Sequence, residues 1–139
     1  MKYVTHIRSD GQYQALKDHL KGVSNRASEF ASAFGASEHA RRTGILHDIG
    51  KYSPLAQQRQ RDPEHTAKVD HATAGAQVAW YMRDPAAAFA IAGHHGGLPD
   101  PGSKMSVDSS TLFCRMQKTL SGLMDPSAWK TEQDRKSVV

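Results

Sequence analysis

Histidines are the residues most able to do chemistry in this chain. The sequence contains eight of them among 139 residues, and five lie between positions 47 and 95. The segment LHDIGKY (residues 46–52) places His47 directly before Asp48, with Lys51 three residues later. Imidazole and carboxylate groups bind Mn, Fe, Co, Ni and Zn, whereas Mg²⁺ prefers oxygen ligands. The doublet therefore indicates a metal site, provided that the rest of the chain supplies further ligands.

Six residues form the candidate ligand set, because they are of ligating types and fall on or next to apolar helix faces. They are His19, His47, Asp48, His71, His94 and His95. His19 shares a predicted helix face with Leu16 and Leu20. His94 and His95 end an apolar run, and two imidazoles there carry a desolvation cost unless something binds them. One shared metal site explains this pattern better than five separately satisfied, inward polar residues in so small a core.

Three of the candidates also have a purely structural interpretation. His19 could be a hydrogen-bonded core histidine, Asp48 a turn residue, and His71 a helix-start residue that bonds to the backbone. His39 and His65 lie in polar surroundings and are predicted to be surface residues, and His6 could approach the site.

The chemistry of such a site would suit phosphoester displacement. An aspartate can bridge two ions with its two oxygens, and two ions about 3.5–4 Å apart can activate water and stabilise the leaving oxygen. Lys51 could stabilise charge on a phosphate or orient the water. Its structural alternative is a solvated lysine near the end of a helix.

Helices must position these residues, because strand signals are nearly confined to residues 3–7. The spacing of apolar residues predicts an all-α domain. Helices are expected from Ser9 or Asp10 to Gly35, at 37–47 with Gly50 as C-terminal cap, within 53–69, at 70–83, from Asp84-Pro85 to His94-His95, and from Ser109 or Ser110 to Leu123. The run AAAFAIAG (86–93) is apolar on every side and is predicted to be buried.

Length and composition define the broad class. A chain of 139 residues forms one domain or part of one, and residues 126–139 are predicted to fray. The single cysteine excludes disulfide pairs and CxxC zinc sites, and neither a membrane span nor a signal peptide is expected. A cytoplasmic location would suit these features. The net charge of +4 favours a polyanionic partner.

Three segments, together with LKDHLKGV (16–23), carry a resemblance to a known family. These are GILHDIGKYSP (44–54), DHATAGA (70–76) and IAGHHGGLPD (91–100). They resemble the HD superfamily of metal-dependent phosphohydrolases. The second and third segments are more specific and resemble the HD nuclease domain of the CRISPR-associated type I helicase-nuclease, in particular its subtype I-C form. The resemblance covers residues 3–102 well.

This resemblance implies an HD-domain helical bundle with a metal site between helices. The six candidates match the family's ligand positions, Asp48 would bridge two ions, and Lys51 would lie close to the bound phosphate. It implies a nuclease that cuts single-stranded DNA with one or two transition-metal ions (Mn, Ni, Co or Fe rather than Mg or Zn). The implied partners are an RNA-guided CRISPR surveillance complex and a helicase in cis or in trans.

Two departures from the family pattern leave alternatives open. The sequence shows no P-loop or helicase region, and Asp125 is a poor match for the last metal-ligating aspartate of the family. We therefore expect a partial HD nuclease domain over residues 1–139. The alternatives are an HD phosphohydrolase of nucleotides or small phosphate esters, and an inactive module that binds the CRISPR interference complex.

Overall fold

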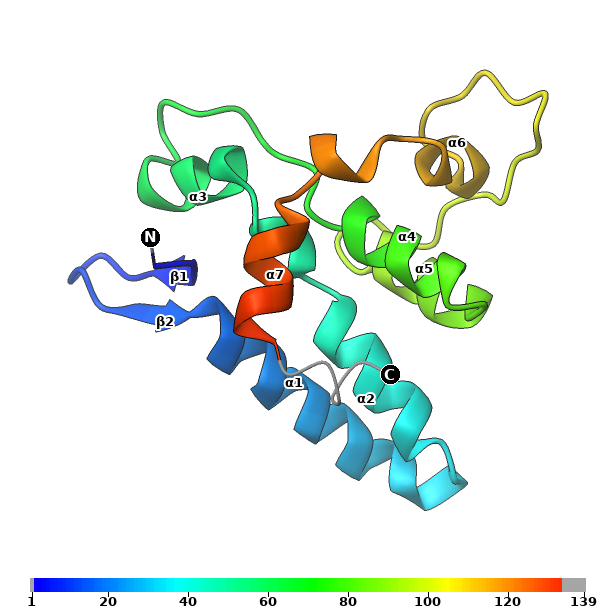
Figure 1. Cartoon of the computed structure of the whole chain (residues 1–139), viewed down its shortest axis with the longest axis horizontal. Helices are drawn as coiled ribbons and strands as arrows, with labels where there is room; N and C mark the ends of the chain where they lie inside the picture. Colours follow the sequence, from blue (N-terminus) through cyan, green and yellow to red (C-terminus); the bar gives the residue numbers. More distant parts are fainter. Residues whose placement is uncertain (1, 134–139) are drawn as a thin grey trace.

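The computed structural model describes residues 2–133, in which seven α-helices follow a small two-stranded sheet (Figure 1). The elements are β1 (Val4–Ile7), β2 (Tyr13–Ala15), α1 (Leu16–Ala31), α2 (Ser37–Leu46), α3 (Pro54–Arg61), α4 (Thr73–Tyr81), α5 (Pro85–Gly93), α6 (Leu112–Met116) and α7 (Pro126–Glu132). Short 3₁₀ turns occupy Ser32–Phe34, Ile49–Lys51 and Leu120–Gly122. The predicted all-α class is confirmed, with the β-hairpin as a minor addition.

The first helix begins later than predicted, because residues 4–15 form a hairpin. The Asp10 side chain accepts a hydrogen bond from the backbone N–H of Gln12, and Gly11 adopts a φ of +83°. Asp10 therefore stabilises a turn instead of capping a helix. Leu16 and Leu20 of α1 are fully buried, and Gly35 ends the following turn in the left-handed conformation, as expected for a helix stop.

The helices α1 and α2 form an antiparallel pair, and α4 and α5 form a second pair beside the end of α2 (Figure 1). Glycines permit the close approach of these pairs. A Cβ on Gly44 of α2 would lie 2.7 Å from the Cα of Ser24 in α1, and a Cβ on Gly75 of α4 would overlap the carbonyl of Leu46. These contacts bring the C-terminal end of α2 against both α1 and α4.

The buried core lies between these two pairs and the turn that follows α2. Its largest fully buried apolar side chains are Leu16, Leu20, Leu46, Ile49, Tyr52 and Ile91. The helix α5 buries one face, including Ala88 and Ile91, while Ala86 and Ala90 are exposed. The prediction that this apolar helix is buried holds for that face only, because alanine is small enough for the other face to lie in water at little cost.

The predicted final helix is broken into α6 and a 3₁₀ turn, with Thr111 instead of Ser109 or Ser110 as its N-cap. The side-chain amide of Gln77 donates hydrogen bonds to the carbonyls of Arg115 and Lys118 at 2.9 and 2.6 Å. These carbonyls are among those that a longer helix would use, so the Gln77 amide stabilises the early end of α6.

Residues 126–132 form α7, which corrects the predicted frayed tail over that part of the chain. The Asp125 side chain accepts hydrogen bonds from the backbone N–H groups of Ser127 and Ala128, Pro126 occupies the first turn, and Trp129 is buried. Residues 134–139 lie outside the described part of the chain. Among residues 2–133, no helix has both the length and the apolar character that crossing a bilayer requires.

Asp84 links the two helix pairs, because its buried carboxylate caps α5 and pairs with α2. It accepts a hydrogen bond from the backbone N–H of Ala87, and its Oδ2 lies 2.9 Å from His39 Nδ1 and 3.4 Å from an Arg42 nitrogen.

We expect Asp84→Ala to lower the free energy of unfolding by about 1–2 kcal/mol, because α5 would no longer have its N-cap. Urea denaturation checks this, with Glu64→Gln at an exposed position as the control. Equal midpoints for the two variants would contradict the assignment.

Candidate metal centre

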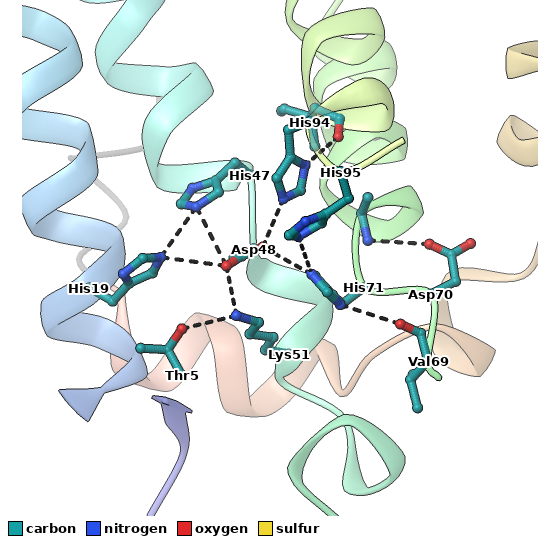
Figure 2. Close-up of polar contacts among 12 residues, drawn as sticks. Thr5, His19, His47, Asp48, Lys51, Val69, Asp70, His71, His94 and His95 are labelled. Atoms are coloured by element: carbon teal, nitrogen blue, oxygen red, sulfur yellow. Dashed lines mark hydrogen bonds and ion pairs between the residues drawn. The ribbon is translucent and has the colours of Figure 1, made fainter. Parts of the chain in front are cut away.

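Asp48 lies at the centre of the candidate site (Figure 2). Its side chain is 5% exposed, and it follows α2 in a non-helical conformation, with φ −119° and ψ 17°. This departure from the helix directs the carboxylate toward side chains from several other elements. The five predicted histidines surround it, together with Lys51.

One carboxylate oxygen of Asp48 faces the histidine that precedes α4 and those that follow α5. The distances from Oδ1 are 3.1 Å to His94 Nε2 and 3.4 Å to His71 Nε2. His95 Nε2 lies 2.7 Å from His71 Nε2. One donor atom from each of these four residues lies within 4.8 Å of all the others, which is close enough to share one ion.

The other oxygen faces α1 and α2. Asp48 Oδ2 lies 3.4 Å from His19 Nε2, 3.5 Å from His47 Nε2 and 3.0 Å from the Lys51 Nζ. The two histidine nitrogens are 3.3 Å apart. His19, His47 and Asp48 form a second group whose donor atoms lie within 4.8 Å of one another. The structure thus divides the predicted ligand set into two groups that share Asp48.

Backbone carbonyls orient two of the imidazoles in the same way. His47 and His94 are the C-cap residues of α2 and α5, and each Nδ1 lies 2.6 Å from the carbonyl oxygen three residues earlier, on Gly44 and Ile91. A carbonyl only accepts hydrogen bonds, so each Nδ1 carries the proton. When the ring is neutral, as metal binding requires, each Nε2 then presents a lone pair toward Asp48.

This orientation tests whether the residues fit a metal ion. A neutral Nε2 and a carboxylate oxygen are both acceptors, and at 3.1–3.5 Å they repel unless a cation lies near them. The nitrogen–nitrogen distances of 2.7 and 3.3 Å also place ligand atoms of neighbouring imidazoles close enough to share an ion. Divalent metal ions coordinated by imidazole and carboxylate would satisfy these groups, so the residues fit the ions.

The electrostatics of the cluster keep Asp48 ionised. Burial opposes the charge. With no ion bound, protonated Nε2 atoms of His19 and His94 donate hydrogen bonds to the carboxylate, and these bonds, together with the charge of Lys51, hold the pKa of Asp48 well below its usual range. Burial lowers the pKa of His47 and of His71, which favours the neutral form that binds metals. For His94, burial is outweighed by Asp48 and the Ile91 carbonyl, and its pKa is raised.

Lys51 is buried in the site instead of being solvated near a helix end. Its ammonium group donates to the hydroxyl of Thr5 at 3.0 Å and pairs with Asp48, and the residue is 4% exposed. Thr5 comes from β1 and is itself fully buried. The sequence alone did not reveal Thr5, because one threonine in a short strand carries no signal of its contact with a lysine 46 residues away.

Gly50 does not serve as the predicted left-handed cap of α2, since its φ is not positive. Its small size matters instead. A Cβ at this position would overlap the carbonyl of His71 and lie 2.7 Å from the His71 Cα. The turn after α2 therefore packs directly against the backbone of a candidate ligand.

The remaining predicted residues lie outside the two ligand groups. The carboxylate of Asp125 caps α7, so the structure does not bring the candidate last aspartate into the site. His39 pairs with Asp84, and His65 pairs with Asp62 and is 77% exposed. The ring of His6 lies edge-on to His19, with centroids 5.8 Å apart, so His6 borders the site without joining either group.

A helical domain that gathers imidazoles around one buried carboxylate has the arrangement of a metal-dependent hydrolase. Comparison with known families agrees, since the HD domain family matches residues 16–127. The chain therefore belongs to the HD domain family, whose members bind divalent metal ions. No curated protein matched the chain.

Replacing Gly50 tests how closely the turn must approach His71. We expect Gly50→Ala to destabilise the fold by about 1–3 kcal/mol, because the new methyl group would displace backbone. Gly22→Ala is the matched control: Gly22 is in the middle of α1, and a Cβ there meets nothing within 4 Å. That change should stabilise the protein by about 0.5–1 kcal/mol. Thermal unfolding of both variants measures the difference, and equal effects would exclude the close approach.

Metal binding should stabilise the folded protein. At a free-ion concentration of about 100 times the Kd, Mn²⁺, Ni²⁺, Co²⁺ or Fe²⁺ should add about 2.7 kcal/mol relative to chelated protein. Asp48→Asn should remove most of this gain, because both ligand groups share Asp48. His65→Ala is the control and should retain the gain. Calorimetry and metal analysis measure both effects, and equal metal content in wild type and Asp48→Asn would contradict the site.

Proposed function

We propose that this HD domain is a metal-dependent nuclease that cleaves single-stranded DNA in type I CRISPR antiviral defence. The observation that carries the proposal is the shared carboxylate of Asp48, with one ligand group on each oxygen. That arrangement suits two ions acting on one phosphodiester. The segments DHATAGA and IAGHHGGLPD support the CRISPR assignment through their resemblance to that nuclease family.

The candidate ligands would divide between two ions in the proposed reaction. His19 and His47 would hold one ion, His71, His94 and His95 the other, and Asp48 both. When bound, the ions would lower the pKa of water and neutralise charge on the phosphate.

The chain's own groups do the positioning. The Gly44 and Ile91 carbonyls fix the rings of His47 and His94, so the ligand atoms are arranged before the substrate arrives. Thr5 holds the ammonium group of Lys51 beside Asp48, where its positive charge can also stabilise the reacting phosphate.

The proposed setting includes further partners. An RNA-guided surveillance complex would expose the single strand, and a helicase in cis or in trans would deliver it to the site. The net charge of +4 is consistent with a polyanionic substrate. This part of the proposal rests on the sequence resemblance.

The substrate can be tested with purified protein supplied with Mn²⁺, Ni²⁺, Co²⁺ or Fe²⁺. We expect cleavage of circular single-stranded DNA and little cleavage of duplex DNA. The rate should fall by at least about a hundredfold in Asp48→Asn, because both ligand groups are disrupted. His65→Ala should retain full activity.

Two results would overturn the proposal. Hydrolysis of nucleoside monophosphates with no action on DNA would instead identify a nucleotide phosphohydrolase. Failure of every metal to support hydrolysis, combined with retention by the RNA-guided complex in a pull-down, would identify an inactive binding module.

A further inference from the structure

A cavity of about 570 Å³ opens beside the metal centre. His71 and His95 form its wall on the metal side. The wall away from the metal site comes from α3 and the loop that joins it to α4, including Arg59, Gln60 and Lys68. A molecule held at the metal centre could therefore extend directly into this space, which we call the α3 cavity.

The α3 cavity carries uncompensated positive charge on the wall formed by α3 and the loop. The Arg59 guanidinium donates hydrogen bonds to the carbonyls of Pro63 and Thr66, the latter at 2.6 Å. Both hydrogen bonds come from Nη1, and the carbonyl oxygens that accept them do not neutralise the charge of the guanidinium. Lys68 is exposed on the loop. Both cations thus remain available to an anion in the cavity.

The acidic residue of the cavity is committed to other groups. Asp70 accepts hydrogen bonds from the backbone and hydroxyl groups of Thr73, and it lies 3.4 Å from Lys118 Nζ and 3.9 Å from an Arg115 nitrogen. These contacts, against the opposing effect of burial, lower the pKa of Asp70 and keep it ionised. The negative charge of Asp70 is therefore balanced by Arg115 and Lys118. It does not neutralise the positive charges of Arg59 and Lys68.

The rest of the lining is suited to the less polar parts of a nucleotide. Ala56, Val69, Ala72 and Ala92 contribute apolar surface to the same lining. Ligand sites generally combine such a surface with a few placed polar groups, and volumes of about 300–1,000 Å³ are typical. The α3 cavity thus has a size and composition that suit one nucleotide unit.

We infer that the α3 cavity binds the nucleotide adjacent to the scissile phosphate, with that nucleotide's own phosphate beside Lys68 and Arg59. This inference rests on the proposed function and specifies how a strand lies across the site. A mononucleotide has a single phosphate group, and the metal centre would bind it. The separate cations of the cavity therefore favour a substrate with at least two phosphates, such as the single-stranded DNA of the proposed function.

Charge reversal at Lys68 is the direct test, because the side chain is exposed and the fold should tolerate the change. Two substrates are compared: a thymidine oligonucleotide, and thymidine 5′-(4-nitrophenyl) phosphate, which has only the scissile phosphate. Lys68→Glu should lower the rate on the oligonucleotide at limiting concentration on the order of tenfold and leave the nitrophenyl ester within about twofold. Lys21→Glu, an exposed site on α1, is the matched control and should change neither rate.

A binding measurement without metal separates this inference from the proposed function. In chelator, fluorescence anisotropy with a labelled thymidine oligonucleotide should show weaker binding for Lys68→Glu than for wild type and Lys21→Glu. Its salt dependence should also be smaller, by about 0.7 in the logarithmic slope for each phosphate that the variant no longer neutralises.

The possible outcomes have distinct meanings. Equal reductions in rate on both substrates, or equal binding by all three proteins, would overturn the cavity assignment even if DNA is cleaved. A wild type that cleaves no DNA would overturn the proposed function, while Lys68-dependent oligonucleotide binding would still support the cavity assignment.

Discussion

The buried carboxylate of Asp48 is the constraint on which the rest of the structure depends. A side chain that is 5% exposed retains its charge only if positive or hydrogen-bonding groups surround it. Imidazoles from α1, α2 and α5, the one that precedes α4, and the ammonium group of Lys51 supply those groups. When the imidazoles are neutral, the same surroundings present several nitrogen lone pairs to the carboxylate, and that excess of acceptors makes the cluster suited to divalent ions.

Helix ends deliver the two best-oriented ligands by one local mechanism. A helix leaves its last carbonyls without intrahelical partners. His47 and His94 each donate a hydrogen bond from Nδ1 to a carbonyl of the last turn, on Gly44 and Ile91, and thereby turn Nε2 toward Asp48. The Ile91 carbonyl also accepts the backbone N–H of His94, at 3.3 Å. In both helices the side-chain contact fixes the tautomer of the ligand. Each ligand group therefore contains one histidine held in this way: His47 faces Oδ2 of Asp48, and His94 faces Oδ1.

Close packing of backbone holds those helix ends together. Because these glycines have no side chain, α1 packs against Gly44, the end of α2 packs against Gly75, and the carbonyl of His71 packs against Gly50. The roles of Thr5 and Gln77 are also tertiary. Thr5 holds Lys51 from a strand, and Gln77 stabilises the end of α6 from another helix. Such contacts join residues 38–46 positions apart, so local patterns could not reveal them.

The sequence by itself determined the helical class, the apolar faces and the identity of the ligand candidates, because helical periodicity and residue chemistry are local properties. It also located the stop at Gly35 and the cap at Asp84. It misplaced the start of α1, the role of Gly50 and the fate of residues 126–132, each of which depends on contacts with other segments. Only the tertiary structure decided which ligand faces which oxygen of Asp48, and that Asp125 lies outside the two ligand groups. These are distances between residues far apart in the chain, and they are set by how the helices pack.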